Sequence, residues 1–435
     1  MSELRDLLED VRRHVRASPG LYEQVLRRHR RRDRNRRMAA GALALAIAGV
    51  GVWGAARALH GVERGEPRPA SPAIDRTNAS RLAPAWTTRT GVLGHSSLVI
   101  AGSTTFVSSL DGNLYALDAR TGKILWKGTT GAGIPQAPVV GDGLVFVHSS
   151  NGSLDAFPVS CHLASCGPKW VGETGGSNGA RPTVASGVVY VSSEAGQLYA
   201  FPTTCGSGGA TCQPLWRGQT GGNRAVAPAV GGGFVWDTSS GSLYAFPASC
   251  TGSCSPALSS FRPGGKFISS DPVVSGGLVY FGTSDGVLYA LPTACASARS
   301  CEPEWFAKTQ GAIAAAPVVV GGTVLVGSSD GSLSVFPIGC ATGGESCRPL
   351  WLGATRGPIA APPIVAAGLV YVASQDGNIY AFPISCGIRG NVCDPAWREP
   401  LIGLSSSPTA WGDRVVYVAT RDGHVIAYTV EGKHI

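Results

Sequence analysis

The sequence has few charged residues and almost no methionine. Asp, Glu, Lys and Arg make up 15% of the 435 residues, and only two methionines occur. These shortages indicate little surface helix. The chain has 60 glycines and 29 prolines instead, which is typical of many tight turns. The composition therefore favours an all-β domain.

A basic surface for nucleic acid is missing from most of the chain. The formal net charge is +8, but residues 1–37 carry 12 Arg, no Lys and six acidic residues, which leaves 24 basic and 22 acidic residues for the remainder. The basic character belongs to a short amino-terminal segment. We therefore exclude nucleic acid as a partner of the large domain.

One long uncharged run follows this basic segment. It starts at Met38 and meets its first charge at Arg57; as a helix these residues would span about 28 Å, close to the roughly 30 Å core of a bilayer. We expect a transmembrane helix over residues 38–59, with a cleaved signal peptide or a buried core helix as the alternatives. The arginines before the run predict a cytoplasmic amino terminus.

These features divide the chain into four parts. Residues 1–37 are predicted to be a basic cytoplasmic tail of short amphipathic helices, which lie on the inner leaflet or dock a cytoplasmic partner. Residues 38–59 are the predicted anchor, and the proline-rich residues 60–80 are a linker. Residues 81–435 form the large domain, on the extracytoplasmic side of the cytoplasmic membrane.

A short signature recurs eight times in the large domain. It consists of a small or acidic residue, Gly, any residue, an aliphatic residue, usually Tyr, and then Ala. The signature begins at Asp111, Asn151, Ala195, Ser240, Asp285, Asp330, Asp376 and Asp422. The spacing is 40 residues once and 44 to 46 thereafter. Four short strands in each repeat of this length predict an eight-bladed β-propeller with four-stranded blades.

Tryptophans near the end of each repeat indicate how the ring closes. They are Trp126, Trp170, Trp216, Trp305, Trp351 and Trp397. Leu258 takes the equivalent place in the repeat that begins at Ser240. The last repeat has no such tryptophan, whereas Trp86 precedes the first repeat. We therefore expect the strand around Trp86 to complete the last blade, which removes the exposed sheet edges.

The first repeat resembles a known family. Residues 108–128, SSLDGNLYALDARTGKILWKG, are similar to the pyrroloquinoline-quinone-type propeller repeat of bacterial proteins, with its D-G-x-L-Y-A-L-D, T-G-K and W. The resemblance covers about residue 82 to the carboxyl terminus and implies that the seven indoles pack between adjacent blades. It selects no single function, because this repeat builds quinone-dependent dehydrogenases, outer-membrane-assembly scaffold lipoproteins and extracellular sensor or adhesion modules.

The twelve cysteines fall in consecutive pairs, one pair in each repeat from the second to the seventh. The pairs are Cys161/Cys166, Cys205/Cys212, Cys250/Cys254, Cys295/Cys301, Cys340/Cys347 and Cys386/Cys393. The gaps vary and fit neither a C-x2-C metal site nor a redox C-x-x-C motif. Strict pairing and the expected compartment predict six disulfides, each across the hairpin between the third and fourth strands of a blade.

Signs of catalysis are scarce. The quinone-dependent dehydrogenases carry adjacent cysteines, which do not occur here, and G-x-S-x-G, H-E-x-x-H and usefully spaced carboxylate pairs are also missing. We predict no catalytic residues, no metal and no cofactor, since no site residues support pyrroloquinoline quinone.

Two charged residues stand at positions expected to line the central channel. Arg181 and Asp271 precede inner strands, where the other repeats have small, uncharged residues. They either pair with each other or with water, or they bind a polar or anionic ligand.

Together these features predict a bacterial single-pass membrane protein. Its propeller would act as a non-enzymatic binding or scaffold module for another envelope protein or a polar ligand. The alternatives are a quinone-dependent oxidoreductase and an envelope sensor that couples ligand binding to the cytoplasmic tail.

Overall fold

The computed structural model describes residues 72–94, 98–176, 180–222, 226–298, 301–340, 346–386, 391–401, 409–411 and 414–432. The chain divides into residues 1–66 and 67–435, and the described residues belong to the second unit. Within this part of the chain, no helix has the length and hydropathy that a membrane span requires. The predicted tail (1–37) and anchor (38–59) lie outside the described residues and stay predictions.

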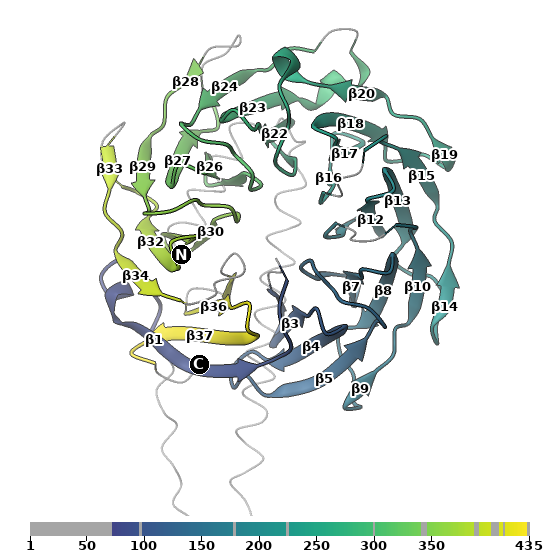
Figure 1. Cartoon of the computed structure of the whole chain (residues 1–435), viewed down its shortest axis with the longest axis horizontal. Coiled ribbons are helices and arrows are strands. Elements are labelled where there is room, and N and C mark those ends of the chain that lie inside the picture. Colours follow the sequence, from purple (N-terminus) through teal and green to yellow (C-terminus); the bar gives the residue numbers. More distant parts are fainter. Residues whose placement is uncertain are drawn as a thin grey trace, which may run out of the picture. The chain divides into compact units, whose positions relative to one another are not determined.

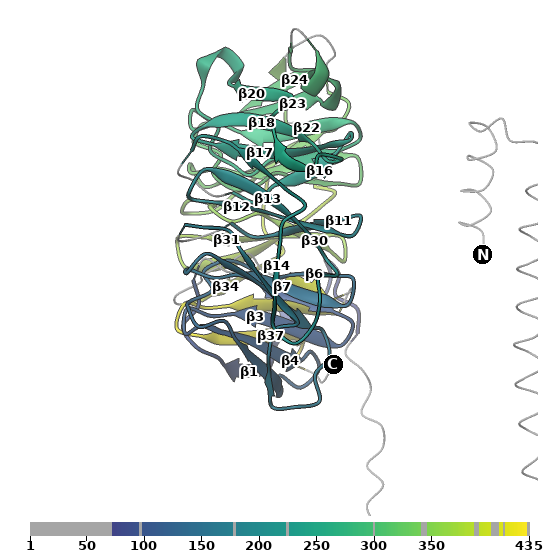
Figure 2. The ribbon, with the colours of Figure 1, turned by 90° about the vertical axis from the view of Figure 1, so that its right-hand side faces the viewer.

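The described residues form eight β-sheets, which surround a common centre as the blades of a propeller (Figure 1). Seen from the side, the blades build a disc (Figure 2). Every blade contributes four strands, which follow one another outward from the centre and are antiparallel to their neighbours. The predicted eight-bladed propeller is confirmed.

The strands of the first four blades follow in chain order. Blade 1 is β2 (Leu98–Ala101), β3 (Thr104–Ser108), β4 (Asn113–Asp118) and β5 (Ile124–Thr129). Blade 2 is β6 (Val139–Gly141), β7 (Leu144–His148), β8 (Ser153–Pro158) and β10 (Trp170–Glu173). Blade 3 is β11 (Thr183–Ala185), β12 (Val188–Ser193), β13 (Gln197–Pro202) and β15 (Trp216–Gln219). Blade 4 is β16 (Ala229–Gly231), β17 (Phe234–Ser239), β18 (Ser242–Pro247) and β20 (Leu258–Phe261).

The other four blades repeat this pattern. Blade 5 is β21 (Val273–Ser275), β22 (Leu278–Gly282), β23 (Val287–Pro292) and β24 (Trp305–Lys308). Blade 6 is β25 (Val318–Val320), β26 (Thr323–Gly327), β27 (Ser332–Pro337) and β29 (Trp351–Ala354). Blade 7 is β30 (Ile364–Ala366), β31 (Leu369–Ser374), β32 (Asn378–Pro383) and β34 (Trp397–Pro400). Blade 8 is β35 (Thr409–Trp411), β36 (Val415–Ala419), β37 (His424–Val430) and β1 (Leu82–Arg89). Three short 3-10 turns complete the elements of the described residues: η1 (Ala79–Arg81), η2 (Pro263–Gly265) and η3 (Thr293–Ser297).

Blade 8 closes the ring as the sequence predicts. The amino-terminal strand β1 pairs with β37 along its whole length, from Leu82 opposite Val430 to Arg89 opposite His424. Figure 1 shows the purple β1 beside the yellow β37. This pairing joins the two ends of the propeller, so the ring opens only if the β1–β37 ladder is broken.

The repeated Asp-Gly signature forms the turn between the second and third strands. In blade 1, the Asp111 carboxylate accepts hydrogen bonds from the Asn113 backbone N–H at 3.0 Å and from the Tyr115 hydroxyl at 2.6 Å. Gly112 follows with a φ of 83°, a conformation that side chains disfavour. Burial raises the pKa of Asp111, but the hydrogen bonds from Tyr115, Ser109 and Asn113 outweigh it and lower the pKa. The signature is therefore a structural turn motif.

The hydrophobic core is divided into eight clusters, each between two neighbouring blades. The tryptophans lie in these clusters. Trp170 of blade 2 packs beside Phe201 of blade 3, and its indole N–H donates to the Thr203 carbonyl at 3.0 Å. Trp86 of blade 8 donates to Ala119 of blade 1 in the same way, at 3.2 Å. The indoles thus link neighbouring blades.

Five sheets differ from the four-stranded prediction because they gain a fifth strand. The structure joins the cysteines in the six predicted pairs, with Cα–Cα distances of 5.1 to 6.3 Å. In five hairpins, the segment with the second cysteine forms a short strand, which we call an arm strand. The arm strands are β9 (Ser165–Cys166), β14 (Ala210–Cys212), β19 (Gly252–Cys254), β28 (Ser346–Cys347) and β33 (Asn391–Cys393).

Each arm strand pairs in parallel with the outermost strand of the preceding blade. For example, β14 belongs to the hairpin of blade 3 but lies on β10 of blade 2, with Cys212 opposite Gly172. The disulfide closes the hairpin at the point where it crosses to the neighbour. The cross-linked hairpins therefore tie blades together and cover outer sheet edges, in addition to closing a turn within one blade.

Candidate docking groove beside blade 4

Among the described residues, no arm strand pairs with β20, the outermost strand of blade 4. In strands that carry an arm, the residue two positions after the tryptophan is small and buried: Gly128, Gly172, Gly218, Ala307 and Gly353. A Cβ at Gly218 would lie 2.4 Å from the Phe246 ring of the next blade. The close packing of neighbouring blades explains the small residue.

Blade 4 departs from this pattern at three positions. Leu258 replaces the tryptophan, Ser260 replaces the small buried residue two positions later, and the next blade presents Leu291 instead of the phenylalanine. Ser260 has a φ of 54°, and the pairing of β20 with β18 is irregular beside it. As a result, Ser259 and Ser260 are both exposed.

The hairpin of blade 5, which would supply the missing arm, is folded differently. Its first cysteine, Cys295, lies in the turn η3 and is buried in the core between blades 4 and 5, whereas Cys301 is only partly buried. In the other five hairpins the second cysteine is the buried one, as Cys212 is. The described part of the blade 5 hairpin thus directs its first cysteine into the core, and none of its described residues pairs with β20.

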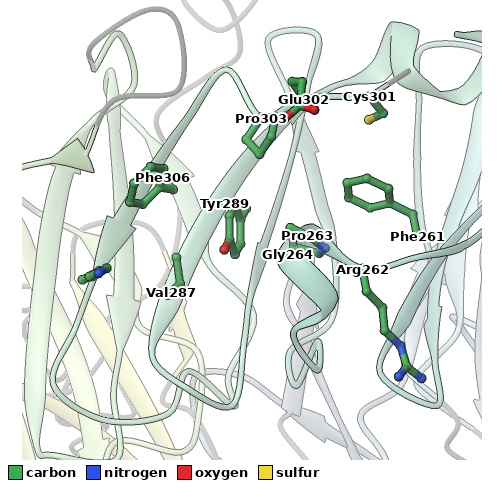
Figure 3. A pocket seen from close by; sticks show the side chains of 11 residues that line it. Phe261, Arg262, Pro263, Gly264, Val287, Tyr289, Cys301, Glu302, Pro303 and Phe306 are labelled. Carbon is green, nitrogen blue, oxygen red and sulfur yellow. The ribbon is translucent and has the colours of Figure 1, made fainter. Parts of the chain in front are cut away.

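A groove of about 680 Å³ opens beside β20. Phe261 and Arg262 form the blade 4 wall, and Val287, Tyr289 and Phe306 form the blade 5 wall (Figure 3). The rings of Tyr289 and Phe306 are 6.2 Å apart. The groove is therefore aromatic on both sides.

Three charged side chains line the groove. The Arg262 guanidinium donates to the Ser242 hydroxyl at 2.7 Å and to the Ser240 carbonyl at 2.6 Å. Lys308 lies exposed on β24, and Glu302 is the acidic residue of the lining. Two cations against one carboxylate give the lining a positive balance. Lys308 also borders a second groove, of about 290 Å³, between blades 5 and 6.

The hydroxyl of Tyr289 adds a polar group to the aromatic wall. Burial raises the pKa of Tyr289, and the negative charge of Asp285 raises it further, while Lys266 opposes them. The hydroxyl is therefore neutral at physiological pH and is able to donate a hydrogen bond.

The predicted channel residues Arg181 and Asp271 lie at the starts of blades 3 and 5. Arg181 is exposed, and Asp271 is partly buried. The structure brings Asp271 close to a carboxylate that the sequence analysis did not select, Asp237 of β17. The signal was present in the sequence, because Asp237 stands where Val147 and Val191 stand in blades 2 and 3.

Asp237 is buried, with 1% of its surface exposed. The Ser192 hydroxyl of blade 3 donates to its Oδ1 at 2.9 Å, and among the described residues nothing bonds to its Oδ2. Burial raises the pKa of Asp237 to about 7; the Ser192 hydrogen bond opposes the shift and the Asp271 charge adds to it. A second buried carboxylate, Asp155, has a pKa of about 6 through burial, despite a 2.6 Å hydrogen bond from Ser153.

These groups do not fit the quinone and metal site that the family resemblance raises. Within the described ranges, no three His, Cys, Asp or Glu side chains are placed to hold a metal ion. Asp237 and Asp271 supply two carboxylates, one of them buried and poor at holding a charge.

The fold and the repeats define the class of the protein: an eight-bladed propeller of pyrroloquinoline-quinone-like repeats, as the sequence resemblance indicates. The family model described as outer membrane protein assembly factor BamB matches residues 72–160 and 339–435. The gap between the two matched segments contains blades 3 to 5, where the groove lies. No curated protein matches the sequence.

Solved structures share the fold at low sequence identity. BamB from Moraxella catarrhalis has a TM-score of 0.62 and 15% identity, over 80% of this chain and 99% of that chain. The designed protein Ika8 has a TM-score of 0.60 and 15% identity, over 79% and 99%. Quinohemoprotein alcohol dehydrogenase from Comamonas testosteroni has a TM-score of 0.58 and 13% identity, over 83% and 78%. An assembly factor, a designed protein and an enzyme share this architecture, so the likeness shows the fold alone.

Proposed function

We propose that this chain is a non-enzymatic scaffold, which binds another envelope protein through the groove beside blade 4. The propeller lies on the extracytoplasmic side of the cytoplasmic membrane, and residues 38–59 anchor it there. The observation that carries this function is the groove itself. It opens where the arm pattern is interrupted, and it combines aromatic walls with a positive balance of charge.

The disulfides support the proposed location. Six cystines are stable in an oxidising compartment and rare in the cytosol. They also suit a scaffold, because hairpins that cross between blades resist relative movement of the blades. A stiff surface loses little conformational entropy when a partner binds.

Photo-crosslinking in the native membrane tests the docking function. A photoreactive phenylalanine derivative replaces Tyr289 in the full chain, and Tyr199 is the matched control, since it has the same strand position in blade 3, behind an arm strand. We expect a specific adduct with one envelope protein from position 289 and none from position 199. Adducts from neither position, or equal adducts from both, would contradict a docking function of the groove.

The alternative of a quinone-dependent oxidoreductase is tested on the same purified full chain. Pyrroloquinoline quinone and Ca²⁺ are added, and the absorption spectrum and dye reduction with primary alcohols are followed. We expect no spectral change and no reduction. Stoichiometric binding of the quinone with substrate-dependent dye reduction would replace the scaffold function by the enzymatic one.

A further inference from the structure

We infer that an extended segment of the partner protein adds to the outer edge of β20 as a fifth strand, parallel to it. This inference rests on the proposed scaffold function and names how the partner is recognised. The partner segment would occupy the position that the chain's own arm strands occupy on five other blades.

The arm strands show that this position accepts polypeptide in a fixed register. Each arm strand forms only two or three residue pairs, and its cysteine lies opposite the small residue two positions after the tryptophan of the strand beneath. On β20 this position is Ser260. A partner residue opposite Ser260 would therefore point inward, as Cys212 does opposite Gly172, and the bulge beside Ser260 limits pairing to a similarly short run.

The exposed residues of β20 agree with the lack of an arm strand on it among the described residues. In β10, β15, β24 and β29 the third residue is buried beneath or beside the arm strand, whereas Ser260 is exposed. In the described structure β20 is the last strand of its sheet. An edge of this kind offers backbone donors and acceptors to a strand from another chain.

The other outer strands without arm strands are covered by other parts of the chain. On blade 7, Ile74 and Ala79 pack with Trp397 of β34. On blade 8, the turn at Gly122 lies against β1 and its carbonyl accepts a hydrogen bond from Thr88 at 2.7 Å. Beside β20 there is a groove instead.

The lining specifies the chemistry of the segment. An inward residue opposite Ser260 has to be apolar, because it faces the rings of Phe261 and Tyr289. The exposed Lys308 and the fixed guanidinium of Arg262 favour a carboxylate at a neighbouring position. The segment is therefore an extended stretch of alternating aliphatic and acidic residues.

Heptapeptides displayed on phage, selected on the full chain in detergent, test the inference. We expect the selected peptides to alternate aliphatic with Asp or Glu. Each selected peptide is then methylated on every second backbone nitrogen, which gives two isomers. The isomer whose methylated nitrogens face β20 should bind about tenfold more weakly, because it lacks the backbone donors that pair with the edge. Lys308→Glu should weaken binding by a similar factor, whereas the same charge change at Lys127, on the arm-covered strand β5, should leave it unchanged.

A second variant covers β20 with an arm strand of the same chain. It replaces the blade 5 hairpin, residues 295–301, with the blade 6 hairpin, residues 340–347, so that an arm strand covers β20, and peptide binding should be lost. Peptides that bind equally well when N-methylated, or no selectable peptide at all, would overturn strand addition. A partner that crosslinks at position 289 through a helical segment would overturn it too, while leaving the scaffold function in place.

Discussion

Asp237 is expected to make the propeller less stable as the pH rises. Its carboxyl is buried beside Asp271, and its pKa in the folded state is about 7. An exposed aspartate in the unfolded chain has a pKa near 3.9. Between these two values the unfolded chain loses the proton while the folded chain keeps it, so stability falls with increasing pH over this range and levels off above pH 7.

The size of the effect follows from the shift. About three pKa units at about 1.4 kcal/mol per unit give an upper limit of about 4 kcal/mol. The variant Asp237→Asn removes the ionisation and keeps an oxygen that accepts the Ser192 hydroxyl. We expect the variant to match the parent near pH 4 and to exceed its free energy of unfolding by up to about 4 kcal/mol at pH 8.

Denaturation of the full chain in detergent, at intervals from pH 4 to pH 8, measures this difference. Asp155 also titrates in this range, with a pKa of about 6, but it contributes equally to parent and variant and cancels in the comparison. Asp271→Asn is the second control: it removes the repulsion and should shift the parent's loss of stability to lower pH. A difference that is constant with pH, or that favours the parent as the pH rises, would refute the reasoning.

Three further predictions concern the joints between blades. Trp170→Phe removes the indole donor and leaves a buried carbonyl unbonded, which should cost about 1 to 3 kcal/mol in thermal denaturation. Gly218→Ala places a Cβ 2.4 Å from the Phe246 ring and should lower the melting temperature, unlike Gly167→Ala at an open position without a positive φ. Replacing Cys386 and Cys393 together by serine should cost about 2.5 kcal/mol, and an unchanged unfolding midpoint would contradict the loop-closure argument.

The local pattern of the repeats made the blades predictable. A spacing of 40 to 46 residues, a turn at each Asp-Gly and a tryptophan after most hairpins are properties of the chain within one repeat, and each has a local physical cause. Trp86, left over before the first repeat, was enough to predict the pairing of β1 with β37. The cysteine pairs were predictable for the same reason, since both members of every pair lie in one hairpin.

The arm strands were not predictable from these patterns. The sequence pattern of a cysteine hairpin does not show whether its second half stays with its own blade or pairs with the preceding blade. The choice depends on the edge that the preceding blade offers. The different burial of Cys295 and Cys301 likewise follows from the space beside blade 4, which the sequence marks by Leu258, Ser260 and Leu291 without showing how the hairpin folds there.

The sequence by itself determined the class of fold, the number of blades, the closure of the ring and the cysteine pairs. These features arise from interactions within one repeat or between the first and the last strand of the propeller. Only the tertiary structure decided where the outer surface is open and which carboxylates meet. The groove beside β20 and the pair Asp237 and Asp271 each join residues of different blades. Their geometry depends on how neighbouring blades pack, which no single repeat encodes.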